Sequence, residues 1–229
     1  DRANWFEQIN NWKQRYPFAY QKQEGAILPQ QAIEEVFHAT KGDAIITTGV
    51  GQHQMWAAQF YKWRFPRQMI TSGGLGTMGY GLPAAIGARV AADDDQTVVC
   101  FDGDGSFLMT MQELSVAVRE NLDITVCILN NAAIGMVRQW QDAFFEKRRM
   151  ASEYPWIPEF DRLAEAFGAR GFRVESYDEV EDTVEKALGY DGPSVIDFLI
   201  DPAEDVYPMV PSGGENGRFA MNQSQLEEL

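Results

Sequence analysis

The stretch that most constrains how this chain can fold runs from residue 97 to residue 131. Thr97–Phe101 and Ile124–Leu129 are short apolar runs rich in β-branched residues, which is typical of buried strands. Between them, Met109–Arg119 carries apolar residues at helical spacing. Strand, turn, helix and strand make a βαβ unit, whose two strand ends lie at one edge of a parallel sheet. Because open α/β sheets bind ligands at that edge, we expect a ligand site there.

The turns that follow these two strands carry groups suited to an anion and a cation. Gly103 and Gly105 let the backbone approach a bulky anion, and the amides from Ser106 onward open a helix that can receive a phosphate. Asp104 and Asn131 each supply a hard oxygen, and with a backbone carbonyl and diphosphate oxygens they would complete an octahedral Mg²⁺ site. Either turn alone is more typical of an ordinary loop, because DG and NN are common turn dipeptides. Together, at the two ends of one βαβ unit, they predict a metal–diphosphate site.

The rest of the chain continues the alternation of strands and helices. Apolar runs predict further strands at Asp43–Thr48, Gln68–Thr71, Gly171–Ser176 and Ser194–Ile200. Helical patterns begin at Pro29 and Gln52 and cover Pro83–Ala92, Ile134–Phe145, Phe160–Phe167 and Val180–Leu188, after an amphipathic segment at Trp5–Tyr16. This order predicts an α/β fold with a doubly wound, mostly parallel sheet and helices on both faces.

The composition excludes some classes of function. The net charge of −15, from 34 acidic and 19 basic residues, argues against nucleic-acid binding, which requires a basic face. High-salt adaptation and an ordinary acidic surface explain that charge equally well. No apolar run approaches the roughly 20 residues of a membrane span. Cys100 and Cys127 lie in apolar strand runs, so we expect them in the core and the chain in a reducing cytoplasm. A chain that starts at Asp1 is expected to be a processed, excised or separately encoded piece.

The GDGS turn, with Asn131 placed 27 positions after Asp104 (131 − 104 = 27), resembles the thiamine-diphosphate motif. The flanking sequences narrow this resemblance to the catalytic subunit of acetohydroxyacid synthase (acetolactate synthase). They are GQHQMW from residue 51, SGGLGTMG from residue 72, GMVRQW from residue 135 and PSGG from residue 211. The resemblance covers most of residues 1–214 and only the last third of such an enzyme. It implies a linker helix at 1–24, the thiamine diphosphate and Mg²⁺ domain at 25–200 and a C-terminal tail at 201–229. Residues 215–229 match no recognised pattern, so we expect a flexible end there.

The resemblance also implies roles residue by residue. The implied cofactor contacts are Gln52, His53, Gly76, Met78, Gly103, Asp104, Gly105, Ser106, Asn131, Gly135 and Met136. Ala133 would give its backbone carbonyl to Mg²⁺ beside Asp104 and Asn131. Val137, Trp140 and Ser212 would line the channel for the 2-oxo acid substrates. Taken alone, a histidine such as His53 is more often structural, but its position after a glycine-rich strand end favours a ligand contact. Taken alone, Trp140 is more typical of core packing.

The same family implies groups that this chain lacks. A glutamate that activates the cofactor's pyrimidine ring comes from another domain of a neighbouring subunit, and FAD is bound largely outside this domain. Glu113 follows the GDGS turn, but it faces the wrong way and is expected to be structural. We therefore expect no catalytic residue in this chain and a homo-oligomer with a pyrimidine-binding domain as partner, with or without a regulatory subunit. A plant-like source would place it in a plastid.

Other functions are compatible with parts of the sequence. Gly74, Gly76 and Gly79 form GxGxxG, and Asp93–Asp95 falls near the acidic position that a nucleotide-dependent dehydrogenase needs, although the preceding strand is weak. A module that holds cofactor for a partner without catalysing a reaction is equally compatible with the composition. Other thiamine-diphosphate enzymes decarboxylate or oxidise pyruvate and share the GDG and NN turns.

Overall fold

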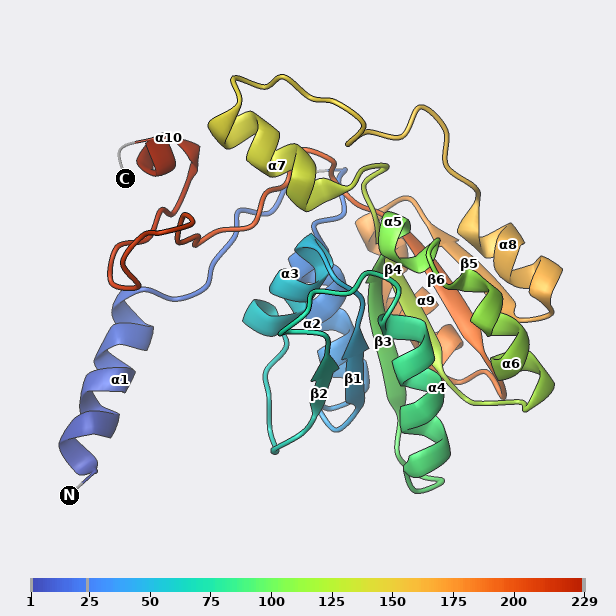
Figure 1. Cartoon of the computed structure of the whole chain (residues 1–229). Helices are drawn as coiled ribbons and strands as arrows, with labels where there is room; N and C mark the ends of the chain where they lie inside the picture. Colours follow the sequence, from blue (N-terminus) through green and yellow to red (C-terminus); the bar gives the residue numbers. More distant parts are fainter. Residues whose placement is uncertain (1, 24, 228–229) are drawn as a thin grey trace.

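The computed structural model describes residues 2–23 and 25–227. Its centre is a six-stranded sheet with the order β2-β1-β3-β4-β6-β5, and every pair of neighbouring strands is parallel (Figure 1). The strands are β1 (Ile45–Thr48), β2 (Met69–Thr71), β3 (Val98–Gly103), β4 (Thr125–Asn130), β5 (Arg170–Val174) and β6 (Ser194–Leu199). The predicted α/β fold is confirmed, and so is the βαβ unit at its centre.

Helices cover both faces of the sheet. They are α2 (Pro29–Ala39), α3 (Gln52–Phe60), α4 (Gly81–Ala91), α5 (Asp104–Phe107), α6 (Leu114–Arg119), α7 (Gly135–Phe144), α8 (Phe160–Phe167) and α9 (Val180–Leu188), with α1 (Ala3–Arg15) and α10 (Gln223–Glu227) near the ends. One apolar cluster joins α2, α3 and α9 to one face, and a second joins α4, α6 and α8 to the other. None of the helices within residues 2–23 and 25–227 is long and apolar enough to cross a bilayer.

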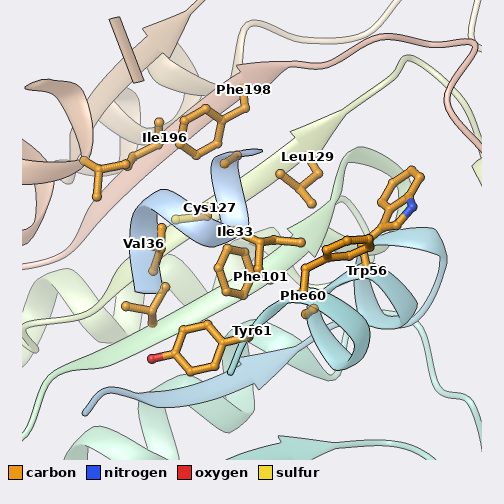
Figure 2. Packing of buried hydrophobic residues seen from close by; sticks show 14 of the residues in the cluster. Ile33, Val36, Trp56, Phe60, Tyr61, Phe101, Cys127, Leu129, Ile196 and Phe198 are labelled. Carbon is orange, nitrogen blue, oxygen red and sulfur yellow. The ribbon is translucent and has the colours of Figure 1, made fainter. Parts of the chain in front are cut away.

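The alternation of side chains along the central strands explains these two layers. In β3, Val99 and Phe101 enter the first cluster, whereas Val98 and Cys100 enter the second. Both faces are covered by helices, so the strand is apolar from Val98 to Phe101, as in other buried parallel sheets. Figure 2 shows the first cluster, in which Phe101 lies among side chains from α2 and α3. Both cysteines are fully buried, as predicted.

The region after the GDGS turn differs from its prediction. The segment Met109–Arg119 is not one helix, because a 3-10 turn at Met111–Glu113 precedes α6. Thr110 interrupts the helix with a φ of −139°, and its hydroxyl donates to the Gly79 carbonyl at 2.7 Å. This hydrogen bond holds the loop near Gly79 against the segment that follows α5.

The C-terminal segment is more structured than expected. The expectation of a flexible end from residue 215 is wrong for the described residues: Met209 and Ala220 pair as an antiparallel bridge, α10 follows, and Leu226 is buried. The last two residues lie outside the described part. Residues 3–15 form the expected helix but bury no residue, and Figure 1 shows α1 projecting away from the sheet. Its role as a linker stays a prediction.

Candidate cofactor site

A cavity of about 240 Å³ lies at the carboxyl ends of β1, β3 and β4. The sheet order places these strands side by side, so three loops that are distant in sequence meet there. Its walls include all eleven residues predicted to contact cofactor, namely Gln52, His53, Gly76, Met78, Gly103, Asp104, Gly105, Ser106, Asn131, Gly135 and Met136. Ala133 and Val137 line it as well.

Asp104 is the only carboxylate among the described residues that line this cavity. Its side chain is buried, and its two oxygens accept hydrogen bonds from the backbone N–H of Gly105 at 2.6 Å and of Ala133 at 3.1 Å. Burial raises the pKa of Asp104 to about 7, although these hydrogen bonds oppose the shift. A buried carboxylate with no cationic side chain beside it is a group that a divalent cation would stabilise in its ionised form.

The second turn presents Asn131 on the other side of the cavity. Ala132 has a φ of 53°, a left-handed conformation that turns the chain sharply between β4 and α7. The first asparagine of the pair supports this turn: Asn130 accepts from the Ala132 N–H at 3.1 Å and donates to Asp197 at 2.9 Å. The second asparagine, Asn131, donates from Nδ2 to Gln52 Oε1 at 3.0 Å, so Asn131 Oδ1 stays available to a ligand.

Ser106 ties three loops together. Its hydroxyl oxygen accepts from the backbone N–H of Gly79 at 3.0 Å and of Val50 at 3.4 Å, and the hydroxyl also hydrogen-bonds the Asp102 carboxylate. The side chain is therefore engaged inside the protein. A phosphate at this turn would have to be bound by backbone amides, as predicted from the sequence.

His53 and Asp102 form a buried pair beneath the cavity. His53 Nε2 lies 3.5 Å from Asp102 Oδ1, and burial lowers the pKa of the imidazole to about 3, so the ring is neutral. Burial also raises the pKa of Asp102 to about 7. Gly103 makes room for the ring, because a Cβ there would lie 2.6 Å from His53 Nδ1. His53 can therefore offer a neutral, hydrogen-bonding ring to a ligand without adding charge.

Residues 49–198 match the family described as "Thiamine pyrophosphate enzyme, C-terminal TPP binding domain". The chain belongs to this family. It is also 48% identical to the mitochondrial acetolactate synthase catalytic subunit of Aspergillus candidus, over 93% of this chain and 31% of that protein. It is 44% identical to the mitochondrial acetolactate synthase catalytic subunit of Saccharomyces cerevisiae, over 99% of this chain and 34% of that protein. The match to the acetolactate synthase large subunit of Lactococcus lactis is 44%, over 93% of this chain and 37% of that protein. The predicted resemblance is confirmed, and the chain spans about a third of the length of these curated relatives.

Two glycines of the cavity wall lie in tightly packed positions. A Cβ at Gly105 would lie 2.6 Å from the Tyr154 hydroxyl, and one at Gly135 would collide with the amides of Gln52 and Asn131. Neither position can hold a side chain, because neighbouring side chains already fill the space. No group of three His, Cys, Asp or Glu side chains in the described part of the chain could hold a metal by itself. Any cation bound here would have to take most of its ligands from amide and backbone oxygens or from a bound molecule.

The structure separates the predicted channel residues. Trp140 lies outside the cofactor cavity and lines a neighbouring apolar groove with Met136, Val137 and Phe145. Its side chain is 44% exposed and meets Phe144 edge-on, so the core-packing alternative is wrong. Ser212 is exposed and lines neither the cavity nor the groove.

The structure also shows residues in and behind the cavity wall that were not predicted from the sequence. Asp102 supports His53 and Ser106 from below, and Trp56, buried against the cavity, has an Nε1 with no partner among the described residues. Gln139 lies behind Gln52 and bonds to it at 2.9 Å. A charged residue at the end of an otherwise apolar strand was the one available signal for Asp102.

The glycine-rich loop does not have the geometry of a dinucleotide site. GxGxxG binds a dinucleotide when it forms a tight turn between a central strand and a helix. Here it follows β2, which lies at the edge of the sheet, and α4 begins only at Gly81. Instead, Gly76 and Met78 line the cavity at the carboxyl ends of β1, β3 and β4.

Proposed function

We propose that this chain holds the diphosphate and Mg²⁺ end of thiamine diphosphate in an acetolactate synthase, a transferase that condenses pyruvate with a second 2-oxo acid. The single observation that carries the proposal is the cavity whose walls bring Asp104 and Asn131 together with five glycines. The names of the relatives support the choice of reaction among thiamine pyrophosphate enzymes. The cofactor would supply the carbon nucleophile that adds to the substrate carbonyl.

The protein's part at this end of the cofactor is to bind and orient. Asp104, Asn131 and the Ala133 carbonyl would hold Mg²⁺, which neutralises the diphosphate. Ala133 fits this role, because its N–H anchors Asp104 while its carbonyl accepts no hydrogen bond from the described residues. Gln52 and the neutral His53 would hydrogen-bond diphosphate oxygens. Burial of these groups excludes water and strengthens each contact.

The apolar groove beside the cavity would receive the second 2-oxo acid. Trp140 and Val137 stand on α7 next to Met136, which lines both the cavity and the groove. A carbon chain longer than that of pyruvate would gain contact with this surface, so α7 would set the preference between second substrates. Ser212 would have to move to take part, since it lies away from both spaces.

The site would be completed by a second domain. The cavity walls contain no carboxylate besides Asp104 among the described residues, and Glu113 is not part of them. We infer that the activating glutamate comes from the pyrimidine-binding domain of the same or a neighbouring subunit in an oligomer. We place FAD, which the resemblance implies, outside these 229 residues. The expected compartment is the cytoplasm or a plastid.

A binding titration tests this proposal. Thiamine diphosphate is titrated calorimetrically into the chain with Mg²⁺ and again with a chelator, and NAD is titrated as the comparison ligand. Binding of thiamine diphosphate that is much tighter with the cation than without it, with no binding of NAD, is the expected result. Cation-independent binding, or binding of NAD instead, would contradict it.

A further inference from the structure

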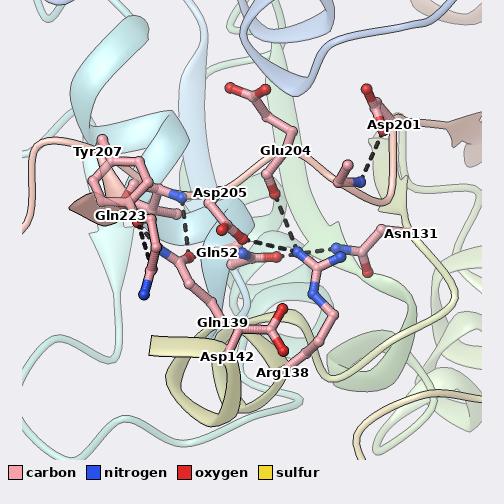
Figure 3. A network of polar contacts seen from close by, with 12 residues as sticks. Gln52, Asn131, Arg138, Gln139, Asp142, Asp201, Glu204, Asp205, Tyr207 and Gln223 are labelled. Atoms are coloured by element: carbon pink, nitrogen blue, oxygen red, sulfur yellow. Dashed lines mark hydrogen bonds and ion pairs between the residues drawn. The ribbon is translucent and has the colours of Figure 1, made fainter. Parts of the chain in front are cut away.

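Three side-chain amides connect the cofactor cavity to the C-terminal segment. Asn131 donates from Nδ2 to Gln52 Oε1 at 3.0 Å, and Gln52 donates from Nε2 to Gln139 Oε1 at 2.9 Å. All three side chains are buried. Asn131 directly follows β4, Gln52 lies on α3 and Gln139 lies on α7 (Figure 3). Gly135 keeps the space around the first of these hydrogen bonds open, because a Cβ there would overlap both amides.

The far end of this amide chain is fixed by backbone. The Val206 N–H donates to Gln139 Oε1, and Gln139 Nε2 donates to the Val206 carbonyl, both at 3.0 Å. A peptide N–H can only donate and a peptide carbonyl can only accept. The amide of Gln139 therefore has one orientation that satisfies both contacts, and turning it over would break both.

The orientation of the Gln139 amide determines the orientation of the Gln52 amide, and through it that of Asn131. Each amide has one accepting and one donating end, so Gln52 must turn its Nε2 toward Gln139 and its Oε1 toward Asn131. Asn131 must then turn its Nδ2 toward Gln52, which leaves its Oδ1 free of hydrogen bonds from the described residues. In the opposite orientation an NH₂ group would face the cation site, and an amide nitrogen with its hydrogens cannot ligate Mg²⁺.

The C-terminal segment is held firmly enough to set this direction. Arg138, the neighbour of Gln139 on α7, bonds Asp205 at 2.9 Å and the Glu204 carbonyl at 3.3 Å. Gln30 donates to the Glu204 carboxylate at 2.7 Å. Two consecutive residues of α7 thus clamp three consecutive residues of this segment (Figure 3).

We propose that Gln139 is a positioning residue that, with the backbone of Val206, fixes which atom of Asn131 faces the divalent cation. Gln139 does not line the cavity and acts only through Gln52. The C-terminal segment thereby becomes part of the cation site without touching it. This inference rests on the proposed function, because the cation is the Mg²⁺ that accompanies thiamine diphosphate.

The test compares three variants of the full chain by calorimetric titration of thiamine diphosphate at a series of Mg²⁺ concentrations. Gln139→Leu removes the fixed end, and we expect the Mg²⁺-dependent affinity to fall about tenfold, as for other residues that orient metal ligands. The affinity measured without the cation should not change. Gln139→Glu should restore Mg²⁺-dependent binding, because a buried carboxyl is held neutral and can both donate to the Val206 carbonyl and accept from Gln52.

Gln141→Leu is the matched control. Gln141 also lies on α7 and also clamps backbone, since it donates to the Met150 carbonyl at 3.0 Å and accepts from the Met150 N–H at 3.2 Å. It has no hydrogen bond to Gln52, so the variant should keep the full Mg²⁺-dependent affinity. Circular dichroism checks folding, and Gln139→Met replaces the leucine variant if the latter does not fold.

The possible results separate this inference from the function on which it rests. Wild-type binding with equal Mg²⁺-dependent affinity in Gln139→Leu overturns the inference and leaves the function standing. A loss of the same size with and without Mg²⁺ also overturns it, because that indicates general damage to the site. Failure of the wild-type chain to bind thiamine diphosphate with Mg²⁺ overturns the proposed function, and the inference with it.

Discussion

The cofactor cavity and the groove on α7 adjoin each other but are built in opposite ways. In the cavity, Asp104, Gln52 and Asn131 are almost fully buried, and each is hydrogen-bonded within the chain. In the groove, Val137 and Trp140 are about half exposed and apolar. The two spaces share Met136, so the change from buried polar to exposed apolar surface occurs within one turn of a helix.

This difference indicates which functions the chain can perform by itself. A buried polar site is organised before its ligand arrives, and little ordering remains to oppose binding. An exposed apolar surface is organised only when something covers it. We infer that the diphosphate end of the cofactor site is complete within this chain, and that the substrate end needs the domain that supplies the activating carboxylate.

The largest expected effect is at Asp104. Asp104→Ala should abolish Mg²⁺-dependent binding of thiamine diphosphate and leave the fold intact, because the side chain lines the cavity and does not pack in either apolar cluster. Calorimetric titration into the folded variant measures the effect. Asp182→Ala, which removes a carboxylate paired with Lys186 on the surface of α9, is the control and should bind normally. Unchanged affinity in Asp104→Ala would contradict the assignment of Asp104 as a Mg²⁺ ligand.

Gly135→Ala should disturb the packing of the cofactor cavity and leave the groove on α7 unchanged. The added methyl group would overlap Gln52 and Asn131, so we expect a loss of about 1–3 kcal/mol in the free energy of unfolding. Mg²⁺-dependent binding should weaken as well. Gly87→Ala is the control, since a Cβ there meets nothing within 4 Å in the middle of α4, and it should stabilise the chain by about 0.5–1 kcal/mol. Urea unfolding measures both, and equal stabilities would contradict the tight packing of the amides.

The pH dependence of the free energy of unfolding should report the buried carboxyl of Asp104. The folded-state pKa of Asp104 is raised to about 7, so its contribution to stability is fully present below the unfolded pKa near 4 and is lost as pH rises through 7. Asp104→Asn lacks this loss. Without a cation, it should therefore become progressively more stable than the wild type between about pH 4 and pH 7. Urea unfolding at several pH values measures the difference, and a constant difference would show that Asp104 is not strained by burial.

The smallest effect on binding is expected at Trp140. In an assembled enzyme, Trp140→Leu should change the ratio of products from pyruvate alone and from pyruvate with 2-oxobutyrate, because it reshapes the groove. Cofactor affinity should not change, and stability should shift by no more than about 0.5 kcal/mol for a half-exposed side chain. Product analysis measures the ratio. An unchanged ratio in a folded enzyme would remove Trp140 from the substrate channel.

The sequence was sufficient to locate the cavity because its parts are local. The GDGS and NN turns each follow an apolar strand, and parallel strands bring such turns to one edge whatever the rest of the chain does. The same logic placed Gln52 and His53 after a glycine-rich strand end. Positions in the cavity could therefore be predicted from motifs, without knowledge of long-range contacts.

What could not be predicted depends on contacts between distant residues. Gln139 meets the backbone of Val206, 67 positions later, and nothing in the GMVRQW sequence indicates that partner. The helix expected from Met109 is broken because Thr110 bonds Gly79, on another loop. A flexible end was expected from residue 215 for the same reason, whereas Phe219 lies against Tyr16 and Met209 pairs with Ala220.

The most direct test of the contrast between the two regions is acetolactate formation from pyruvate by the purified chain. It is measured at saturating thiamine diphosphate and Mg²⁺, with and without the remaining domains of an acetolactate synthase supplied as a separate chain. We expect no turnover by the chain alone, since general acid–base assistance worth about 10²–10⁴-fold is missing, and turnover once those domains are added. Turnover by the chain alone, at a rate comparable to that of a full-length enzyme, would show that the catalytic carboxylate lies within these residues, with Glu113 the first to re-examine.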